Sequence, residues 1–166
     1  MKPSEFVQTY LEYAQDTEAY TGISAVFTLA QAALESGWGK SAIGYNFFGI
    51  KAKSNTPDNK RQLFTTKEVL NHPNASFPQV ISVTKRSDGK YLYVVKDWFR
   101  KYDSPEESFT DHAKFFLENK RYAKALEYKS DPNRFAEEIS KAGYATATDY
   151  SSVLKGVIGT IENNMP

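Results

Sequence analysis

The sequence predicts an α+β fold that is mainly α-helical, with a small antiparallel β region near the middle of the chain. Towards both ends of the chain, apolar residues recur every three or four positions, which is the helical period. Between residues 62 and 98, β-branched and aromatic runs flank an Asp-Gly turn, as in a hairpin. No repeat, low-complexity tract or linker interrupts this order, so we expect a single domain over residues 1–166 with a β lobe at about 62–98.

Two helices are expected before the β region. The first covers residues 4–19 and is ended by Tyr20-Thr21-Gly22. The second covers residues 23–35, and Gly37 is well placed as the left-handed residue that ends it. Its apolar stripe is formed by Ile23, Val26, Phe27, Ala30, Ala33 and Leu34.

Three strands are expected in the β region, at residues 63–69, 80–84 and 91–95, because these segments are rich in β-branched and aromatic side chains. Asp88-Gly89 predicts the turn between the second and third strands. The polar stretch 53–61 and the proline-containing stretch LNHPNASFP are expected to be loops.

Helices return at Ser104, where Ser104-Pro105-Glu106-Glu107 supplies an N-cap, a proline at the first helical position and the glutamate of a capping box. This helix should reach about residue 117. A short helix around 121–126 follows, then one from Asp131-Pro132 to about 143. Asp149 is expected to cap a last helix that ends near residue 161.

The composition excludes several classes of function. With 21 basic and 20 acidic residues the net charge is +1, which argues against nucleic acid and against a charged membrane surface as partners. The absence of cysteine excludes disulfides and thiolate chemistry, and two histidines, His72 and His112, are too few for a typical metal site. We therefore expect no metal and no cofactor. No signal peptide and no apolar run of membrane-spanning length is visible, so we expect no membrane insertion.

The chemically informative stretch is LAQAALESGWGKSAIGYNFFGIKA, residues 29–52, in which Glu35 stands at the end of a predicted helix. The helix macrodipole is negative at that end, and Leu34 and Trp38 offer apolar surroundings. Both effects disfavour ionisation of a carboxyl group, which suits a general acid. The alternative is an ordinary solvated charge at a helix end, and this pattern alone leaves both interpretations open.

The strings AQAALESGWGKS and NFFGIKA resemble the bacterial cell-wall glucosaminidase family, which usually reads AQ-x-x-LESGWG-x-S and then N-L/F-FGIK. DWFRKYDSPEESFTDHAKFF, RYAKAL and KAGYAT resemble later family segments in the same order, so the resemblance extends over residues 22–152. It implies endo-β-N-acetylglucosaminidase activity and a lysozyme-like helical domain with a β-hairpin lobe, as in autolysins, flagellar muralytic proteins and phage lysins.

Carried over to this chain, the resemblance implies that Glu35 is the catalytic acid and that Tyr144 of AGYAT lines the active site and supports catalysis. Glu68, in Thr66-Lys67-Glu68, matches the setting of the family's second carboxylate. Its alternative reading is an exposed strand charge, and its rivals are Asp88, Asp97 and Asp103.

Further residues are expected to support the site. Trp38 is either a sugar platform or a core anchor. Asn46 can bind an N-acetyl group, while Phe47 and Phe48 are expected to pack under the cleft as part of the substrate-binding set. His112 is expected to be structural. The chain departs from the family after GYAT, where Ala147-Thr148-Asp149-Tyr150 replaces the usual Asp-Pro before a tyrosine.

The predicted function is hydrolysis of the β-1,4 bond after N-acetylglucosamine in peptidoglycan glycan strands, by a monomer acting on the cell wall. Glu68 could activate water, or the substrate's own 2-acetamido group could assist with Tyr144. The alternatives are a muramidase, a lytic transglycosylase and a non-catalytic wall-binding or assembly module. The route to the wall is left open between release as a phage lysin, origin as a domain of a longer secreted protein, and non-classical export.

Overall fold

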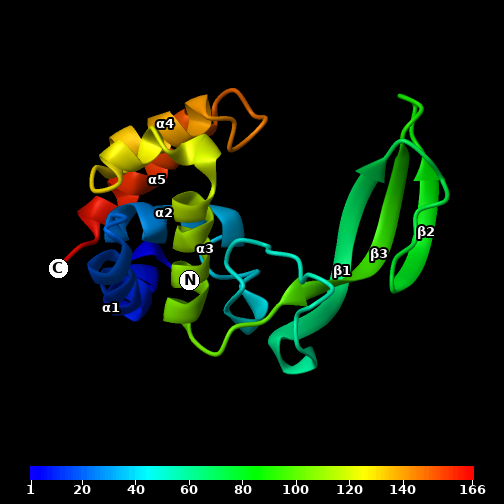
Figure 1. Ribbon diagram of the computed structural model, residues 1–166, viewed down its shortest axis with the longest axis horizontal. Helices are drawn as coiled ribbons and strands as arrows, with labels where there is room; N and C mark the ends of the chain where they lie inside the picture. Colours follow the sequence, from blue (N-terminus) through cyan, green and yellow to red (C-terminus); the bar gives the residue numbers. More distant parts are fainter. The chain divides into compact units, whose positions relative to one another are not determined.

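The computed structural model describes residues 1–166, which form two compact units. The helical unit contains residues 1–48 and 102–166, and the β unit contains residues 49–101, inserted between them in the sequence. Five α-helices belong to the first unit and a three-stranded antiparallel sheet belongs to the second (Figure 1). The predicted α+β class, mainly helical with an antiparallel β region, is confirmed.

The predicted long helices are all present, with ends within two residues of those expected. Their bounds are α1 Pro3–Thr21, α2 Ala25–Ser36, α3 Pro105–Glu118, α4 Pro132–Lys141 and α5 Tyr150–Asn163. The short helix expected at 121–126 is instead a pair of 3-10 turns, Lys120–Tyr122 and Ala125–Tyr128. Two further 3-10 turns lie at Ile43–Tyr45 and Asp58–Lys60. None of the helices combines the length and the apolar character needed to cross a membrane.

Local capping explains where these helices begin. The Ser104 hydroxyl accepts a hydrogen bond from Glu107 N (3.1 Å), so the predicted N-cap of α3 is confirmed. At α2, Ser24 does the same for Phe27 N (3.2 Å). The predicted side-chain cap of α5 is wrong, because Asp149 makes no such bond. Its ψ of 7° departs from the extended conformation that aims a capping carboxylate at the first N–H groups.

Helix α2 is the centre of the helical unit, and nine of its twelve residues are buried. It packs against α1, α4 and α5. The ring of Phe27 lies 4.6 Å from that of Phe135 and 5.9 Å from that of Phe116, measured between centroids. A helix that is apolar nearly all round is fixed on all sides by its neighbours. Its last turn therefore provides a rigid base for the side chains that project from it.

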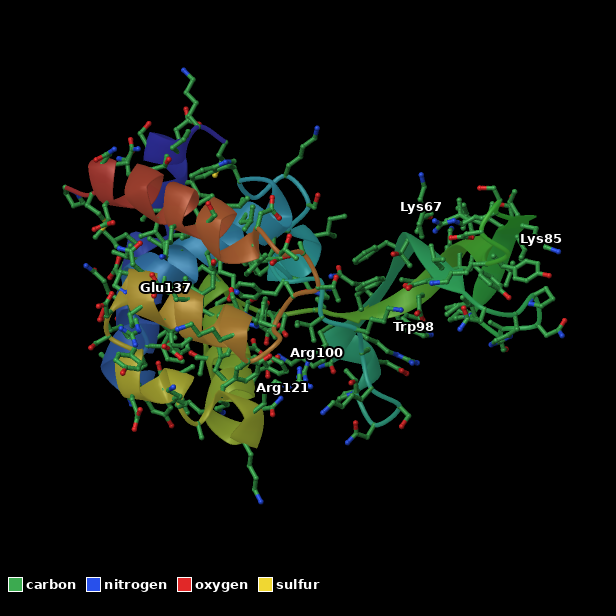
Figure 2. All side chains as sticks on the ribbon, turned by 90° about the horizontal axis from the view of Figure 1, so that it is seen from above. Lys67, Lys85, Trp98, Arg100, Arg121 and Glu137 are labelled. Atoms are coloured by element: carbon green, nitrogen blue, oxygen red, sulfur yellow. The ribbon has the colours of Figure 1, made fainter.

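The β unit is a sheet of β1 Arg61–Leu70, β2 Gln79–Lys85 and β3 Tyr91–Arg100, in the order β1-β3-β2. The central strand β3 pairs with both neighbours, and places Tyr93 opposite Glu68 and Asp97 opposite Phe64. The predicted turn at Asp88-Gly89 is confirmed: the glycine has φ 84°. Polar side chains such as Lys67 project from this sheet into solvent (Figure 2).

Candidate active site

Glu35 lies in the last turn of α2, immediately before an unusual turn of the backbone. Gly37, Trp38 and Gly39 have φ values of 59°, 58° and 86°, so three consecutive residues are left-handed. Glycine adopts this conformation without strain, which explains why two glycines flank the tryptophan. The Ser36 hydroxyl accepts from Gly39 N (2.8 Å) and donates to Ala32 O (2.6 Å). Helix α2 therefore ends one residue after Glu35.

The carboxyl group of Glu35 is exposed, and its Oε1 accepts a hydrogen bond from the Tyr150 hydroxyl (2.9 Å). The expectation that apolar neighbours enclose it is wrong. Trp38 turns towards the core, where its ring packs edge-on against Phe6 with centroids 5.5 Å apart. Leu34 is also only half-buried. A polar partner from α5, and not an apolar wall, thus holds the predicted acid.

A chain of hydrogen bonds continues behind Glu35. Gln31 Nε2 donates to the Tyr150 hydroxyl oxygen (3.0 Å), and Gln31 Oε1 lies 2.7 Å from His112 Nε2. Gln31 and His112 are buried. Gln31 and Tyr150 were not predicted from the sequence as parts of the candidate site. One signal was available, because Gln31 precedes Glu35 by four residues and shares its face of the helix.

Tyr144, which the resemblance implied lines the active site, lies beside this series of hydrogen bonds. It is half-buried, and its ring centroid is 5.5 Å from that of Tyr150 and 6.3 Å from that of His112. Burial, with an added effect of the Glu35 charge, raises the pKa of both tyrosines well above the usual value. Both phenols therefore stay protonated at neutral pH, and that of Tyr150 donates to Glu35. The helical unit brings Glu35, Tyr144 and Tyr150 together.

The other predicted substrate-binding residues divide by burial. Asn46 and Phe47 are 3% and 1% exposed, so neither presents a free surface to a sugar. Phe47 packs among Phe6, Tyr10 and Phe109, which places it in the core of the helical unit. Trp38 and Phe48 are only partly buried at the edge of the core. The burial of Phe47 agrees with the expectation that it packs under the cleft, whereas the burial of Asn46 argues against direct contact with an N-acetyl group.

Glu68 lies on β1 of the β unit, where it is half-buried and paired with Lys51 (2.6 Å). The same lysine contacts Asp97 Oδ2 at 3.3 Å. Partial burial opposes the charge on Lys51, but its bonds to the two carboxylates outweigh this and raise its pKa. Lys51 is thus the shared cation of two acidic groups. The rival Asp88 pairs with Arg86 and accepts from Lys90 N, so it serves the hairpin turn.

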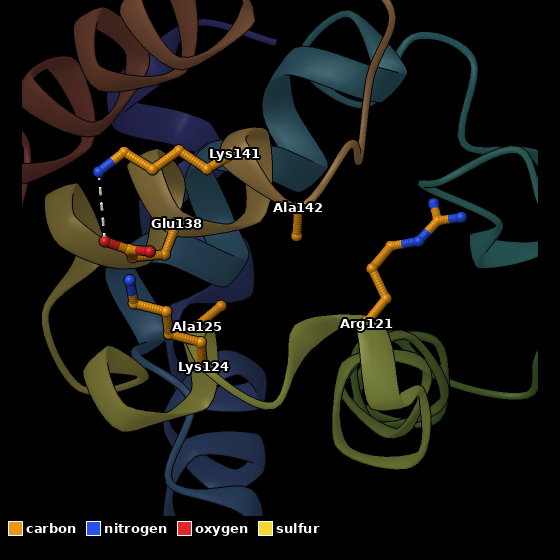
Figure 3. Close-up of a pocket in the computed structure, with 6 residues that line it drawn as sticks. All are labelled: Arg121, Lys124, Ala125, Glu138, Lys141 and Ala142. Carbon is orange, nitrogen blue, oxygen red and sulfur yellow. Dashed lines mark hydrogen bonds and ion pairs between the residues drawn. The ribbon is translucent and has the colours of Figure 1, made fainter.

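A pocket of about 220 Å³ lies elsewhere on the helical unit (Figure 3). It is lined by Arg121, Lys124, Ala125, Glu138, Lys141 and Ala142. Glu138 is 3% exposed, and its Oε1 is 3.1 Å from Arg134 Nε and 3.5 Å from Lys141 Nζ. Burial works to raise the pKa of Glu138, but the hydrogen bond from Arg134 and the lysine charges lower it overall. This pocket contains none of the predicted site residues.

Comparison with known proteins gives three relevant similarities. The sequence model described as mannosyl-glycoprotein endo-beta-N-acetylglucosaminidase matches residues 11–163. The peptidoglycan hydrolase FlgJ of Pseudomonas aeruginosa is 35% identical over 154 residues, which are 89% of this chain and 34% of that protein. A probable N-acetylmuramidase of Lactococcus lactis is 30% identical over 163 residues, covering 92% of this chain and 32% of its own length.

The fold is also similar to a solved structure, a C-terminally truncated glycoside hydrolase domain of FlgJ from Salmonella typhimurium. The TM-score is 0.75 at 28% identity, and the match covers 99% of this chain and 100% of that one. The chain spans about a third of the length of both curated relatives named above.

Proposed function

The chain belongs to the glucosaminidase family of glycoside hydrolases, and on this premise we propose that it cleaves the β-1,4 bond after N-acetylglucosamine in peptidoglycan glycan strands, with Glu35 as general acid. One observation carries the proposal: an exposed carboxyl at the end of a buried helix is held by the hydroxyl of Tyr150. The similarity to a protein named peptidoglycan hydrolase supports the choice of polymer.

Glycosidic cleavage requires protonation of the leaving oxygen and stabilisation of an oxocarbenium-like centre. In the proposed mechanism, protonated Glu35 supplies the proton at the leaving oxygen. Tyr144 presents a phenol that is protonated at neutral pH, and burial raises its pKa further. Its hydroxyl can therefore donate to substrate atoms near the reacting carbon, and the 2-acetamido group is the first candidate.

The second component of the mechanism has two forms. In one, Glu68 acts as the base that activates water, and Lys51 fixes its orientation through the 2.6 Å ion pair. In the other, the substrate's acetamido oxygen attacks the reacting carbon and Tyr144 orients it. The variants Glu68→Gln and Asp97→Asn form a matched pair, since each removes one carboxylate charge next to Lys51. If Glu68 is the base, Glu68→Gln is expected to lower kcat much more than Asp97→Asn does.

We further propose that the protein acts at the cell wall, as a monomer whose partner is the glycan strand. A second candidate activity is that of a muramidase, which the similarity to a probable N-acetylmuramidase favours. Both candidates use the same acid and differ in which of the two alternating glycosidic bonds enters the site.

Mass spectrometry of borohydride-reduced digestion products tests the proposal. Purified peptidoglycan treated with the wild-type protein is expected to give new reducing ends on N-acetylglucosamine. New reducing ends on N-acetylmuramic acid would show that the other of the two alternating bonds is cleaved. New 1,6-anhydro ends would indicate a lytic transglycosylase. If folded protein gives no products from several wall types, a binding or assembly role replaces the enzymatic one.

A further inference from the structure

Three helices contribute to one continuous hydrogen-bonded chain that ends on the proposed acid. It runs from His112 in α3 through Gln31 in α2 and Tyr150 at the start of α5 to Glu35. The successive distances are 2.7, 3.0 and 2.9 Å, all within the normal range for hydrogen bonds.

The direction of each hydrogen bond follows from the groups involved. Gln31 uses its NH₂ group towards Tyr150, so the hydroxyl hydrogen of Tyr150 is available to donate to Glu35. The remaining oxygen of Gln31 is an acceptor, which requires that His112 carries its hydrogen on Nε2. His112 Nδ1 is buried without a partner. The opposite tautomer would place an N–H at Nδ1, and a buried N–H without an acceptor is rarer than a buried acceptor without a donor. The tautomer with its hydrogen on Nε2 is therefore favoured.

We propose that His112, Gln31 and Tyr150 are positioning residues that keep Oε1 of Glu35 occupied as a hydrogen-bond acceptor and thereby place the acid's proton on Oε2. The inference rests on the proposed role of Glu35 as general acid. A protonated carboxyl carries its hydrogen on one oxygen only, and Oε1 is engaged by a donor. The proton is then on the oxygen that the chain leaves unoccupied, ready for the leaving group.

Burying polar side chains at positions 112 and 31 is unfavourable, which argues against a purely structural role for His112 and Gln31. The imidazole of His112 stacks on Phe48 at 3.8 Å and contacts Phe115 and Phe116 in an aromatic cluster. Phenylalanine would pack there without an unpaired buried nitrogen, which is unfavourable. Gln31 is likewise a fully buried amide, in a helix where most of the buried residues are apolar. The polar atoms at both positions are accounted for by the chain that leads to Glu35.

His112 holds this series of hydrogen bonds in place because its Nε2 donor sets the orientation of the Gln31 amide. Without the Nε2 donor, the amide can rotate by half a turn and present its oxygen to Tyr150. The hydroxyl of Tyr150 would then donate to Gln31 and withdraw its hydrogen from Glu35. A substitution in α3, outside direct contact with the carboxyl, is therefore expected to disturb the acid.

Steady-state kinetics of His112→Phe and His112→Gln on soluble glycan fragments tests the proposal. His112→Phe keeps the aromatic packing and removes the donor, whereas His112→Gln loses the ring and returns an amide donor near the Nε2 position. We expect His112→Phe to lower kcat about tenfold with little change in KM, and His112→Gln to recover most of that loss. A packing role predicts the reverse order of activity.

Tyr150→Phe and the double variant with His112→Phe add a second readout. Because both act through the same chain, the double variant is expected to lose no more than Tyr150→Phe alone. Wild-type kcat in His112→Phe, or losses that multiply in the double variant, would overturn the proposal. If His112→Phe does not fold, Gln31→Met breaks the chain in its place and carries the same expectation.

Glu35→Gln in the same assay separates the two proposals. If Glu35→Gln is active, the proposed acid is wrong whatever the other variants do. If Glu35→Gln is inactive while His112→Phe matches the wild type, the result supports Glu35 as the acid and contradicts the positioning role of His112.

Discussion

His112→Phe is also expected to change how the stability of the helical unit depends on pH. Burial in an aromatic environment lowers the pKa of His112 from 6.5 to about 3. Between those pH values the unfolded chain binds a proton that the folded chain does not, so the folded state loses stability as the pH falls below 6.5. Each pH unit in this interval corresponds to about 1.4 kcal/mol, so about 3 kcal/mol is lost on going from pH 7 to pH 4.5.

Urea unfolding, followed by the far-ultraviolet circular dichroism of the helices, measures this effect. The wild-type protein is expected to lose about 3 kcal/mol more than His112→Phe between pH 7 and pH 4.5. Carboxylates such as Glu137 and Glu138 titrate in both proteins, so the comparison cancels their contribution. Equal pH dependence in the two proteins would refute the reasoning, since it would mean that His112 titrates in the folded state as it does in the unfolded chain.

Other substitutions test separate parts of the structure. Leu29→Ala removes a fully buried side chain of α2 and is expected to lower the free energy of unfolding by about 2–5 kcal/mol in urea titrations. Gly37→Ala places a Cβ on a residue with φ 59° and should lower the free energy of unfolding by about 1–2 kcal/mol, although that Cβ would make only an ordinary contact, with Lys40 Cβ at 4.0 Å. Because the pKa of Glu138 is lowered, its stabilising contribution exists above about pH 4.3 and is lost below it; Glu138→Gln should lower the melting temperature at pH 7 and flatten its fall in acid. In hydrolysis assays, Glu68→Gln should lower kcat at least tenfold more than Asp97→Asn if Glu68 is the base.

The features that were predicted from sequence are those set by neighbouring residues. The left-handed end of α2 at Gly37, the cap of α3 at Ser104 and the turn at Asp88-Gly89 each depend on a few consecutive side chains. Apolar periodicity located the long helices for the same reason. Asp149 was the exception, because its side chain has the right chemistry while its backbone lacks the usual capping conformation.

The environment of the candidate acid could not be predicted in this way, because it is assembled from distant segments. Glu35 and Tyr150 are separated by 115 residues, and Gln31 and His112 by 81. Their hydrogen bonds exist only once α2, α3 and α5 have packed. The same holds for Asn46, which was expected to bind an N-acetyl group and which tertiary packing buries. The resemblance pointed to Glu35 as the candidate acid, but only the fold identifies its hydrogen-bond partners.

Digestion of purified peptidoglycan by the wild-type protein and by Glu35→Gln tests the proposed mechanism most directly. Glutamine keeps the size of the side chain and an acceptor for the Tyr150 hydroxyl, and it removes the transferable proton. The mutant is expected to unfold at the same urea concentration as the wild type and to release no new reducing ends, while the wild type releases N-acetylglucosamine ends. Undiminished release by folded Glu35→Gln would contradict the assignment of Glu35 as the general acid.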